Sequence, residues 1–216
     1  MIYAGYDARE AIGYHVFAQS LIDTSPGVGI LPLVNLAPQG DGSNAFTYSR
    51  FAIPELQRSG PALYVDGSDM LLRVDVQELL DLFDPRYAVQ VVKHDYKTRY
   101  PRKYVGTPME CDNHDYPRKN WSSVILWNCD HPANRQRDLF ERDGAYLHRF
   151  GWLEDHEIGA LPKEWNWLAD EYGANLDAKL LHWTTGIPGL LRYYRNAPHA
   201  GEWLAVRDRV LAGSHS

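Results

Sequence analysis

In the first third of the chain, short continuous runs of apolar residues alternate with stretches in which apolar residues recur at the spacing of a helix. Residues 1–6, MIYAGY, predict a buried strand, and Asp7 with Glu10 behind it has the spacing of a capping box at a helix start. Apolar side chains then recur every three or four positions as far as the Ser-Pro-Gly at 25–27, which predicts a helix. Residues 28–35 predict a second strand.

The same alternation continues along the chain after each predicted turn. We predict helices at 45–56, 74–83, 134–149 and 201–211, and strands at 61–66, 87–93, 122–127 and 178–183. Residues 94–121 are polar and irregular, and so long a connection inside a compact domain is usually functional or disordered. Strands that alternate with helices predict an α/β sheet with right-handed crossovers.

Composition narrows the class of protein. The length of 216 residues predicts one domain, and the net charge of −6 argues against a nucleic-acid partner. Cys111 and Cys129 are too few for a disulfide framework, so we expect reduced thiols and a cytoplasmic location. We expect no signal peptide and no transmembrane segment, because no run approaches the ~18 apolar residues of a membrane span. The oligomeric state has no signature in the sequence.

The stretch LYVDGSDMLL, residues 63–72, places two carboxylates between apolar runs at the end of a predicted strand. Sheets of this kind bind ligands beyond the carboxyl ends of their strands. Asp66 and Asp69 converge only if Gly67 and Ser68 turn the chain, because residues three apart on a strand point to opposite faces. Divalent ions such as Mg²⁺ and Mn²⁺ bind carboxylates together with substrate phosphates. A solvated turn is the alternative, and the apolar residues on both sides favour the metal site.

Four further stretches accompany this turn: IYAGYDARE (2–10), TYSRFAIPEL (47–56), KNWSSVILWN (119–128) and KLLHWTTGIPG (179–189). Together they resemble glycosyltransferases of the GT-A fold, and most closely family 8, which includes glycogenin and the bacterial lipopolysaccharide galactosyl- and glucosyltransferases. The resemblance implies a single-domain, Rossmann-like mixed sheet flanked by helices. It implies that the donor nucleotide contacts about 1–93, and the donor sugar and acceptor about 94–200.

The first two stretches imply donor-binding residues. IYAGYDARE is similar to the family's opening strand, which holds the uracil and ribose of a UDP-sugar, so Ala4, Gly5, Tyr6 and Asp7 are carried over as nucleotide contacts. TYSRFAIPEL resembles the family's T-Y-x-R-hydrophobic-x-I-P-E-L segment, whose arginine faces the donor. The resemblance therefore implies that Arg50 is a catalytic and donor-binding residue.

The turn and the last stretch imply a metal site. DGSD resembles the family's D-x-D, which binds Mn²⁺ and the donor diphosphate, but here the second acid comes one position later. Either Ser68 occupies that position or Asp69 reaches the ion, and we favour Asp66 with Asp69 because a carboxylate is the better ligand. KLLHWTTGIPG resembles H-x-x-G-x-x-K-P-W, which implies His182 as the third ligand and Gly186 as a donor contact. The implied cofactor is Mn²⁺ or Mg²⁺, and the implied donor is a UDP-sugar.

The remaining resemblances concern the donor sugar. KNWSSVILWN is similar to the family's F-N-S-G-V-M-L-I-N strand, and the donor contacts that this implies are Lys119, Asn120, Trp121, Ser122 and Ser123. GWLEDHEIGALPKEWNWL, residues 151–168, is similar to D-Q-D-x-x-N…L-P-x-x-W-N, whose acids approach the reacting carbon. Asp155 is the catalytic residue that this resemblance implies, with Glu157 as the second choice.

One family feature is missing. The lysine that neutralises the donor diphosphate has no counterpart, because Ile187 and Pro188 occupy the corresponding region. The basic residues that are candidates to replace it are Lys93, Lys97, Lys103, Arg118 and Lys119.

The implied reaction transfers a hexose from a nucleoside diphosphate sugar to an acceptor hydroxyl, with retention of configuration. The acceptor is a glycan, a lipid-linked sugar or a protein, and the sequence does not distinguish these. Two alternatives stay open: a non-catalytic nucleotide-sugar binding protein, and a metal-dependent hydrolase or nucleotidyltransferase. The second alternative needs another acidic cluster, for which the sequence offers Glu110, Asp112 and Asp115.

Overall fold

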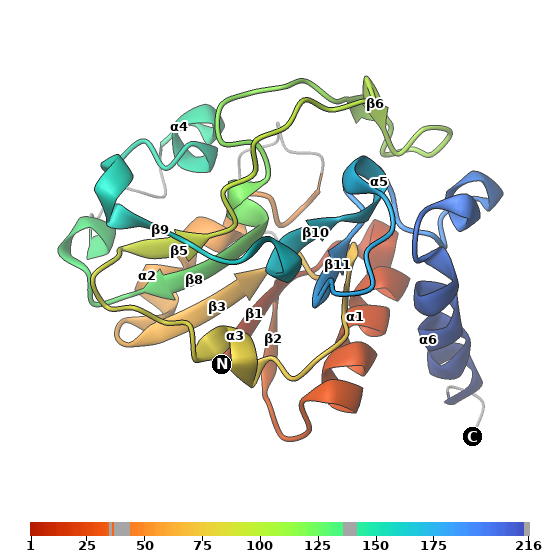
Figure 1. Ribbon diagram of the computed structural model, residues 1–216, viewed down its shortest axis with the longest axis horizontal. Helices are drawn as coiled ribbons and strands as arrows, with labels where there is room; N and C mark the ends of the chain where they lie inside the picture. The colour runs from red at the N-terminus through yellow and green to blue at the C-terminus, as the bar shows by residue number, and fades with distance from the viewer. Residues whose placement is uncertain (35, 37–43, 136–141, 214–216) are drawn as a thin grey trace.

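A six-stranded sheet forms the centre of the molecule (Figure 1). The computed structural model describes residues 1–34, 36, 44–135 and 142–213. The strands of the sheet in spatial order are β2 (Ile30–Leu33), β1 (Ile2–Gly5), β3 (Pro61–Val65), β8 (Val124–Asn128), β5 (Val89–Val91) and β9 (Ile158–Ala160). β1 is parallel to β2 and β3, whereas β8 is antiparallel to β3 and β5. The predicted α/β class, with a mixed sheet flanked by helices, is confirmed.

A second, three-stranded sheet holds the chain that follows β3. It has the order β10 (Trp167–Leu168), β11 (Leu180–His182) and β4 (Met70–Leu72). β11 is antiparallel to β4, and His182 is paired with Met70. This register places His182 next to the residue before Met70, which is Asp69. Within the long 94–121 connection, β6 (Arg102–Lys103) and β7 (Cys111–Asp112) pair as a separate antiparallel ribbon.

Two long helices lie side by side next to the three-stranded sheet (Figure 1): α1 (Ala11–Thr24) and α6 (Ala200–Gly213). The shorter helices are α2 (Ile53–Gln57), α3 (Gln77–Leu80), α4 (Gly144–His148) and α5 (Ala169–Tyr172). α1 touches the acidic turn directly, since a Cβ on Gly13 would lie 1.8 Å from the Ser68 carbonyl oxygen. Glycine is therefore required at this contact, where α1 packs directly against the acidic turn.

Three predicted helices are wrong in length, because polar side chains bond to the backbone where the helix was expected. In 45–56 the Thr47 hydroxyl bonds to the Asn44 carbonyl, and only a 3-10 helix at Ser49–Ala52 followed by α2 forms. In 74–83 the Asp75 carboxylate accepts the Gln77 N–H at 2.9 Å, and the helix is reduced to α3. In 134–149 the Asp143 carboxylate accepts the Tyr146 N–H and starts α4 there. Positions 136–141 of that prediction lie outside the described residues.

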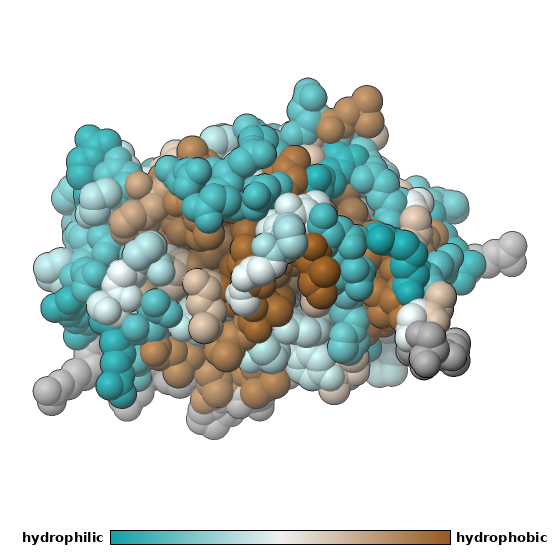
Figure 2. Space-filling model, turned by 90° about the horizontal axis from the view of Figure 1, so that it is seen from below, coloured by the Kyte–Doolittle hydropathy of each residue, from teal (hydrophilic) through white to brown (hydrophobic). Residues whose placement is uncertain are grey.

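The core occupies both faces of the main sheet and the space beneath the small one. One cluster of buried side chains includes Phe51, Trp127 and Trp152, and another on the α1 side includes Phe17 and Leu21. Apolar side chains also gather on the face seen in Figure 2, where polar ones surround them. In the part of the chain that the structure describes, no helix combines the length and the apolarity needed to cross a membrane.

Candidate active site

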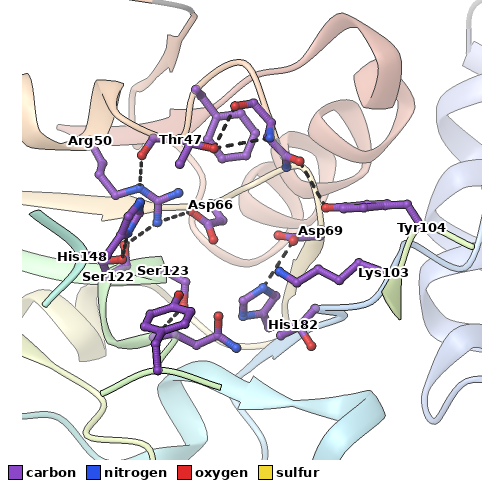
Figure 3. Close-up of a pocket in the computed structure, with 15 residues that line it drawn as sticks. Thr47, Arg50, Asp66, Asp69, Lys103, Tyr104, Ser122, Ser123, His148 and His182 are labelled. Carbon is purple, nitrogen blue, oxygen red and sulfur yellow. Dashed lines mark hydrogen bonds and ion pairs between the residues drawn. The ribbon is translucent and has the colours of Figure 1, made fainter. Parts of the chain in front are cut away.

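Asp66, Asp69 and His182 meet at the carboxyl end of β3 (Figure 3). The chain turns at Gly67, whose φ of +71° is a conformation that other residues rarely adopt. The turn brings Asp69 to the start of β4, and the β4–β11 pairing sets His182 Nε2 3.3 Å from Asp69 Oδ2. One ligand atom from each of the three residues lies within 4.8 Å of the others.

The surroundings of these residues fit a divalent cation. Asp69 Oδ1 is buried and has no hydrogen-bond partner among the described residues, which is costly for a carboxylate oxygen. His182 Nδ1 lies 2.9 Å from the Asn166 side-chain oxygen. When Nδ1 donates to that oxygen, Nε2 keeps its lone pair for a metal, which is the usual arrangement of a metal-binding histidine. These three residues could therefore hold a divalent ion.

Electrostatics in the site favour an additional positive charge. Burial raises the pKa of Asp66, and the neighbouring Asp69 adds to the shift against the opposing effect of Arg50. Burial alone would lower the pKa of His182, but Asp69 and Asp66 outweigh it and the pKa is raised. Both shifts show that the carboxylates lack sufficient compensation, and a bound cation would supply it.

Arg50 neutralises one of the two carboxylates. Its Nη1 lies 2.7 Å from Asp66 Oδ1 and donates to the Ser122 carbonyl at 2.6 Å, while Nε donates to the Thr47 carbonyl at 2.9 Å. The guanidinium also lies 4.8 Å from the centre of the Tyr64 ring. With only 5% of the residue exposed, Arg50 is held rigidly beside the acidic turn.

A cavity of about 100 Å³ opens over these groups and collects residues from both halves of the chain. It is lined by seven residues that the sequence predicted for the site: Arg50, Asp66, Asp69, Asn120, Ser122, Ser123 and His182. Lys103, one of the candidates to replace the missing lysine, lines it as well. A second cavity of about 460 Å³ shares Thr47, Lys103, Tyr116 and His148 with the first.

Sequence reasoning missed His148, which lines both cavities. Its Nδ1 lies 2.8 Å from the Ser122 hydroxyl oxygen. Burial, together with the charges of Arg50 and Lys103, lowers the pKa of His148 to about 3, so the imidazole is neutral. Asn44 and Tyr104 in the cavity wall were missed as well. A histidine inside a predicted helix and a tyrosine in an irregular loop carry no motif that would have marked them.

The nucleotide contacts predicted at the N-terminus do not line this cavity. β1 is buried, and a Cβ on Gly5 would lie 2.3 Å from the Phe46 ring. Asp7 caps the 3-10 helix that precedes α1, forms an ion pair with Arg9 and accepts the Ala45 N–H at 2.8 Å. Contacts of Ala4, Gly5, Tyr6 and Asp7 with a nucleotide stay a prediction.

Four other predicted residues are engaged away from the three possible ligands. Ser68 is buried, with its hydroxyl 3.5 Å from Glu10 Oε2, which favours Asp69 over Ser68 as the second acid. Trp121 donates to the His94 carbonyl at 2.9 Å. Gly186 packs against a ring, since a Cβ there would lie 2.8 Å from Tyr194. The Asp155 side chain is 91% exposed and paired with Arg118, and it does not line the cavity.

A buried carboxyl group lies beneath the acidic turn. Glu10 is fully buried, and its Oε2 accepts from the Asn44 amide at 3.3 Å. Its other oxygen has no partner among the described residues. Burial, reinforced by Asp69 and Asp7, raises the pKa of Glu10 from 4.5 to about 8. Glu10 is therefore protonated at neutral pH. The predicted capping box does not form, because neither carboxyl oxygen accepts the Asp7 N–H.

We predict that Glu10→Gln makes the protein more tolerant of alkaline pH. A carboxyl whose pKa is higher in the folded state keeps its full contribution below pH 4.5 and loses it as the pH rises to about 8. Glutamine cannot ionise, so between pH 5 and pH 9 the variant should lose about 2–4 kcal/mol less unfolding free energy than wild type. Urea unfolding in EDTA at both pH values measures this. Glu55→Gln, on the exposed side of α2, is the control, and equal losses in all three proteins would contradict the prediction.

Known structures define the class of protein to which this fold belongs. The chain aligns with the bifunctional glycosyltransferase WbbM with a TM-score of 0.58 and 14% identity, over 95% of this chain and 51% of that one. It aligns with the glycosyltransferase GlyE of Streptococcus pneumoniae with a TM-score of 0.64 and 14% identity, over 98% and 63%. For the galactosyltransferase LgtC the TM-score is 0.55 at 13% identity, over 96% and 95%. The fold is that of GT-A glycosyltransferases, and identities this low show the fold alone.

Sequence comparison places the chain more narrowly. No family model matches it. Protein CDI of Arabidopsis thaliana is 38% identical over 207 residues, which cover 87% of this chain and 78% of that protein. The chain therefore belongs to the same family as Protein CDI.

Proposed function

We propose that this protein is a metal-dependent glycosyltransferase that moves a hexose from a UDP-sugar to an acceptor hydroxyl with retention of configuration. The observation that carries the proposal is the group formed by Asp66, Asp69 and His182, at the carboxyl end of β3 in a GT-A fold. The acceptor class, whether glycan, lipid-linked sugar or protein, is left open by this proposal.

In this proposal Asp66, Asp69 and His182 hold Mn²⁺ or Mg²⁺, which supplies stabilisation of the negative charge on the leaving diphosphate. Arg50 keeps one carboxylate neutralised and fixed in place through its bonds to Asp66 and Ser122. Preorganised charges of this kind need no rearrangement as the glycosidic bond breaks.

The cavity wall supplies polar groups for the donor sugar. The Asn120 side chain donates to the Tyr96 hydroxyl at 2.7 Å, which orients its amide, and the Ser122 hydroxyl lies against neutral His148. An uncharged imidazole beside a hydroxyl can exchange hydrogen bonds with sugar hydroxyls without repelling an electron-poor anomeric carbon. We assign Asn120, Ser122 and His148 to orientation of the sugar.

The test is nucleotide release from a panel of UDP-, GDP- and ADP-sugars with Mn²⁺, with Mg²⁺ and with EDTA. We expect UDP release that requires the metal and disappears in Asp66→Ala. Stabilisation by UDP with Mn²⁺ but without release would favour the non-catalytic binding protein. Release of a nucleoside monophosphate or of pyrophosphate would favour the hydrolase or nucleotidyltransferase.

The structure gives the hydrolase alternative no second metal cluster within the described residues. Arg102 lies 2.6 Å from Glu110 and 2.7 Å from Asp112, and Asp115 accepts the Thr98 N–H at 3.0 Å. In the part of the chain that is described, Asp66, Asp69 and His182 are the one group of three ligands close enough to hold an ion. Glycosyl transfer with one metal is therefore the favoured function.

A further inference from the structure

The Lys103 ammonium places a positive charge at the cavity and forms no ion pair with another described residue. Lys103 lines the same cavity as Asp66, Asp69 and His182, and Figure 3 shows its side chain reaching toward Asp69 and His182. Its side chain forms no hydrogen bond or ion pair with another described residue. A lysine that is half-buried beside an acidic cluster, yet unpaired, is available for an anionic ligand.

The chain on both sides of Lys103 is anchored, so its position is set by the fold. Arg102 is tied to Glu110 and Asp112 across the β6–β7 ribbon. Tyr104 is 2% exposed, donates its N–H to the Thr185 carbonyl at 2.7 Å and its hydroxyl to Asn44 at 3.3 Å. The backbone of Lys103 is thereby held against the segment that follows His182.

The other basic residues of this connection have different surroundings. Lys119 is 5% exposed, and its ammonium donates to Asn113 and to the His114 carbonyl, both at 2.6 Å. Burial, with the nearby charge of Lys103, lowers the pKa of Lys119 to about 8. Arg118 is paired with Asp155, and Lys93 lies 5.7 Å from the Trp121 ring centre. These three residues and exposed Lys97 do not line the cavity over the acidic turn, although Lys119 lines the second cavity beside it.

We infer that Lys103 binds the diphosphate of the donor and of the released nucleotide, a role that rests on the proposed function. Arg50 already compensates Asp66, whereas the Lys103 side chain forms no ion pair with another described residue. Its ammonium is therefore available to the oxygens of a diphosphate bound beside the acidic turn. Of the basic residues that the sequence offers for the diphosphate, this inference therefore selects Lys103, because the Lys119 ammonium is bonded within the connection.

The test compares Lys103→Met with Lys97→Met, an exposed lysine of the same connection. Titration calorimetry with UDP, inorganic pyrophosphate and UMP in Mn²⁺ reports binding without depending on turnover. We expect Lys103→Met to weaken UDP and pyrophosphate binding about 10–100-fold, as for loss of a charged hydrogen bond. UMP binding should weaken less, Lys103→Arg should restore most of the UDP affinity, and Lys97→Met should behave as wild type.

Each outcome has a separate meaning. Unchanged UDP affinity in Lys103→Met, with wild type binding UDP, would overturn the role of Lys103 and leave the proposed function intact. Absence of UDP and pyrophosphate binding by wild type would overturn the proposed function and this inference with it. Thermal melts without ligand should agree within about 2 °C for the Lys103 and Lys97 variants, since neither side chain has a hydrogen-bond or ion-pair partner among the described residues.

Discussion

Asp69→Asn should lower metal-dependent nucleotide release about 10³-fold, the size of effect expected when a preorganised electrostatic group is lost from a reaction centre. Asp69 contributes one oxygen to His182 and leaves the other buried without a partner among the described residues. Asparagine keeps the shape but removes the charge that a divalent ion needs, and its amide could turn a donor toward the ion. The folded protein should survive the change, because a neutral side chain is easier to bury than an unpaired carboxylate.

The effect should appear first in metal binding. Titration with Mn²⁺, followed by thermal melting with and without EDTA, should show stabilisation of wild type and little or none of Asp69→Asn. Asp81→Asn is a matched control, since this exposed acid at the end of α3 accepts a surface hydrogen bond from the Gln77 side chain and lies outside the cavity. If Asp69→Asn kept both Mn²⁺ stabilisation and nucleotide release, the assignment of the metal site would be wrong.

The acidic turn could be located from sequence because its determinants are local. A strand, a glycine that permits a positive φ and a second apolar run specify a turn at Asp66–Asp69 without reference to the rest of the chain. His182 was found through the order of motifs, and the structure explains the spacing by the register of β11 against β4. Sequence could not choose between Ser68 and Asp69, because the choice depends on a distant buried residue. In the fold the Ser68 hydroxyl is directed toward Glu10, which leaves Asp69 as the second acid of the site.

The basic and catalytic side chains were harder to predict because long-range packing decides where they point. Lys103 and Lys119 lie in one irregular connection, and no local pattern tells a structural lysine from one that faces the site. Buried partners in the folded protein make the difference, namely Asn113 for Lys119 and Tyr104 as the anchor next to Lys103. Helix lengths failed for a related reason, since side chains such as that of Asp143 compete with the backbone pattern.

Arg50→Met should destabilise the protein by about 3–5 kcal/mol, as expected when one partner of a buried ion pair is removed. Both side chains of the Arg50–Asp66 pair are largely buried, with 6% and 13% exposed. Methionine keeps part of the volume but leaves Asp66 charged next to Asp69. It also loses the hydrogen bonds that Arg50 donates to the Thr47 and Ser122 carbonyls. Urea unfolding in EDTA measures the loss without any contribution from a bound metal.

Two further variants separate the charge from the packing. Arg86→Met removes an arginine that is paired with Asp84 at 2.5 Å but is 78% exposed, and its unfolding free energy should stay close to that of wild type. Asp66→Asn in the Arg50→Met background removes the uncompensated charge and should recover part of the lost stability. If Arg50→Met unfolded like Arg86→Met, the pair would contribute nothing to the fold. If the double variant recovered nothing, the cost would lie in packing and the lost carbonyl bonds rather than in the charge of Asp66.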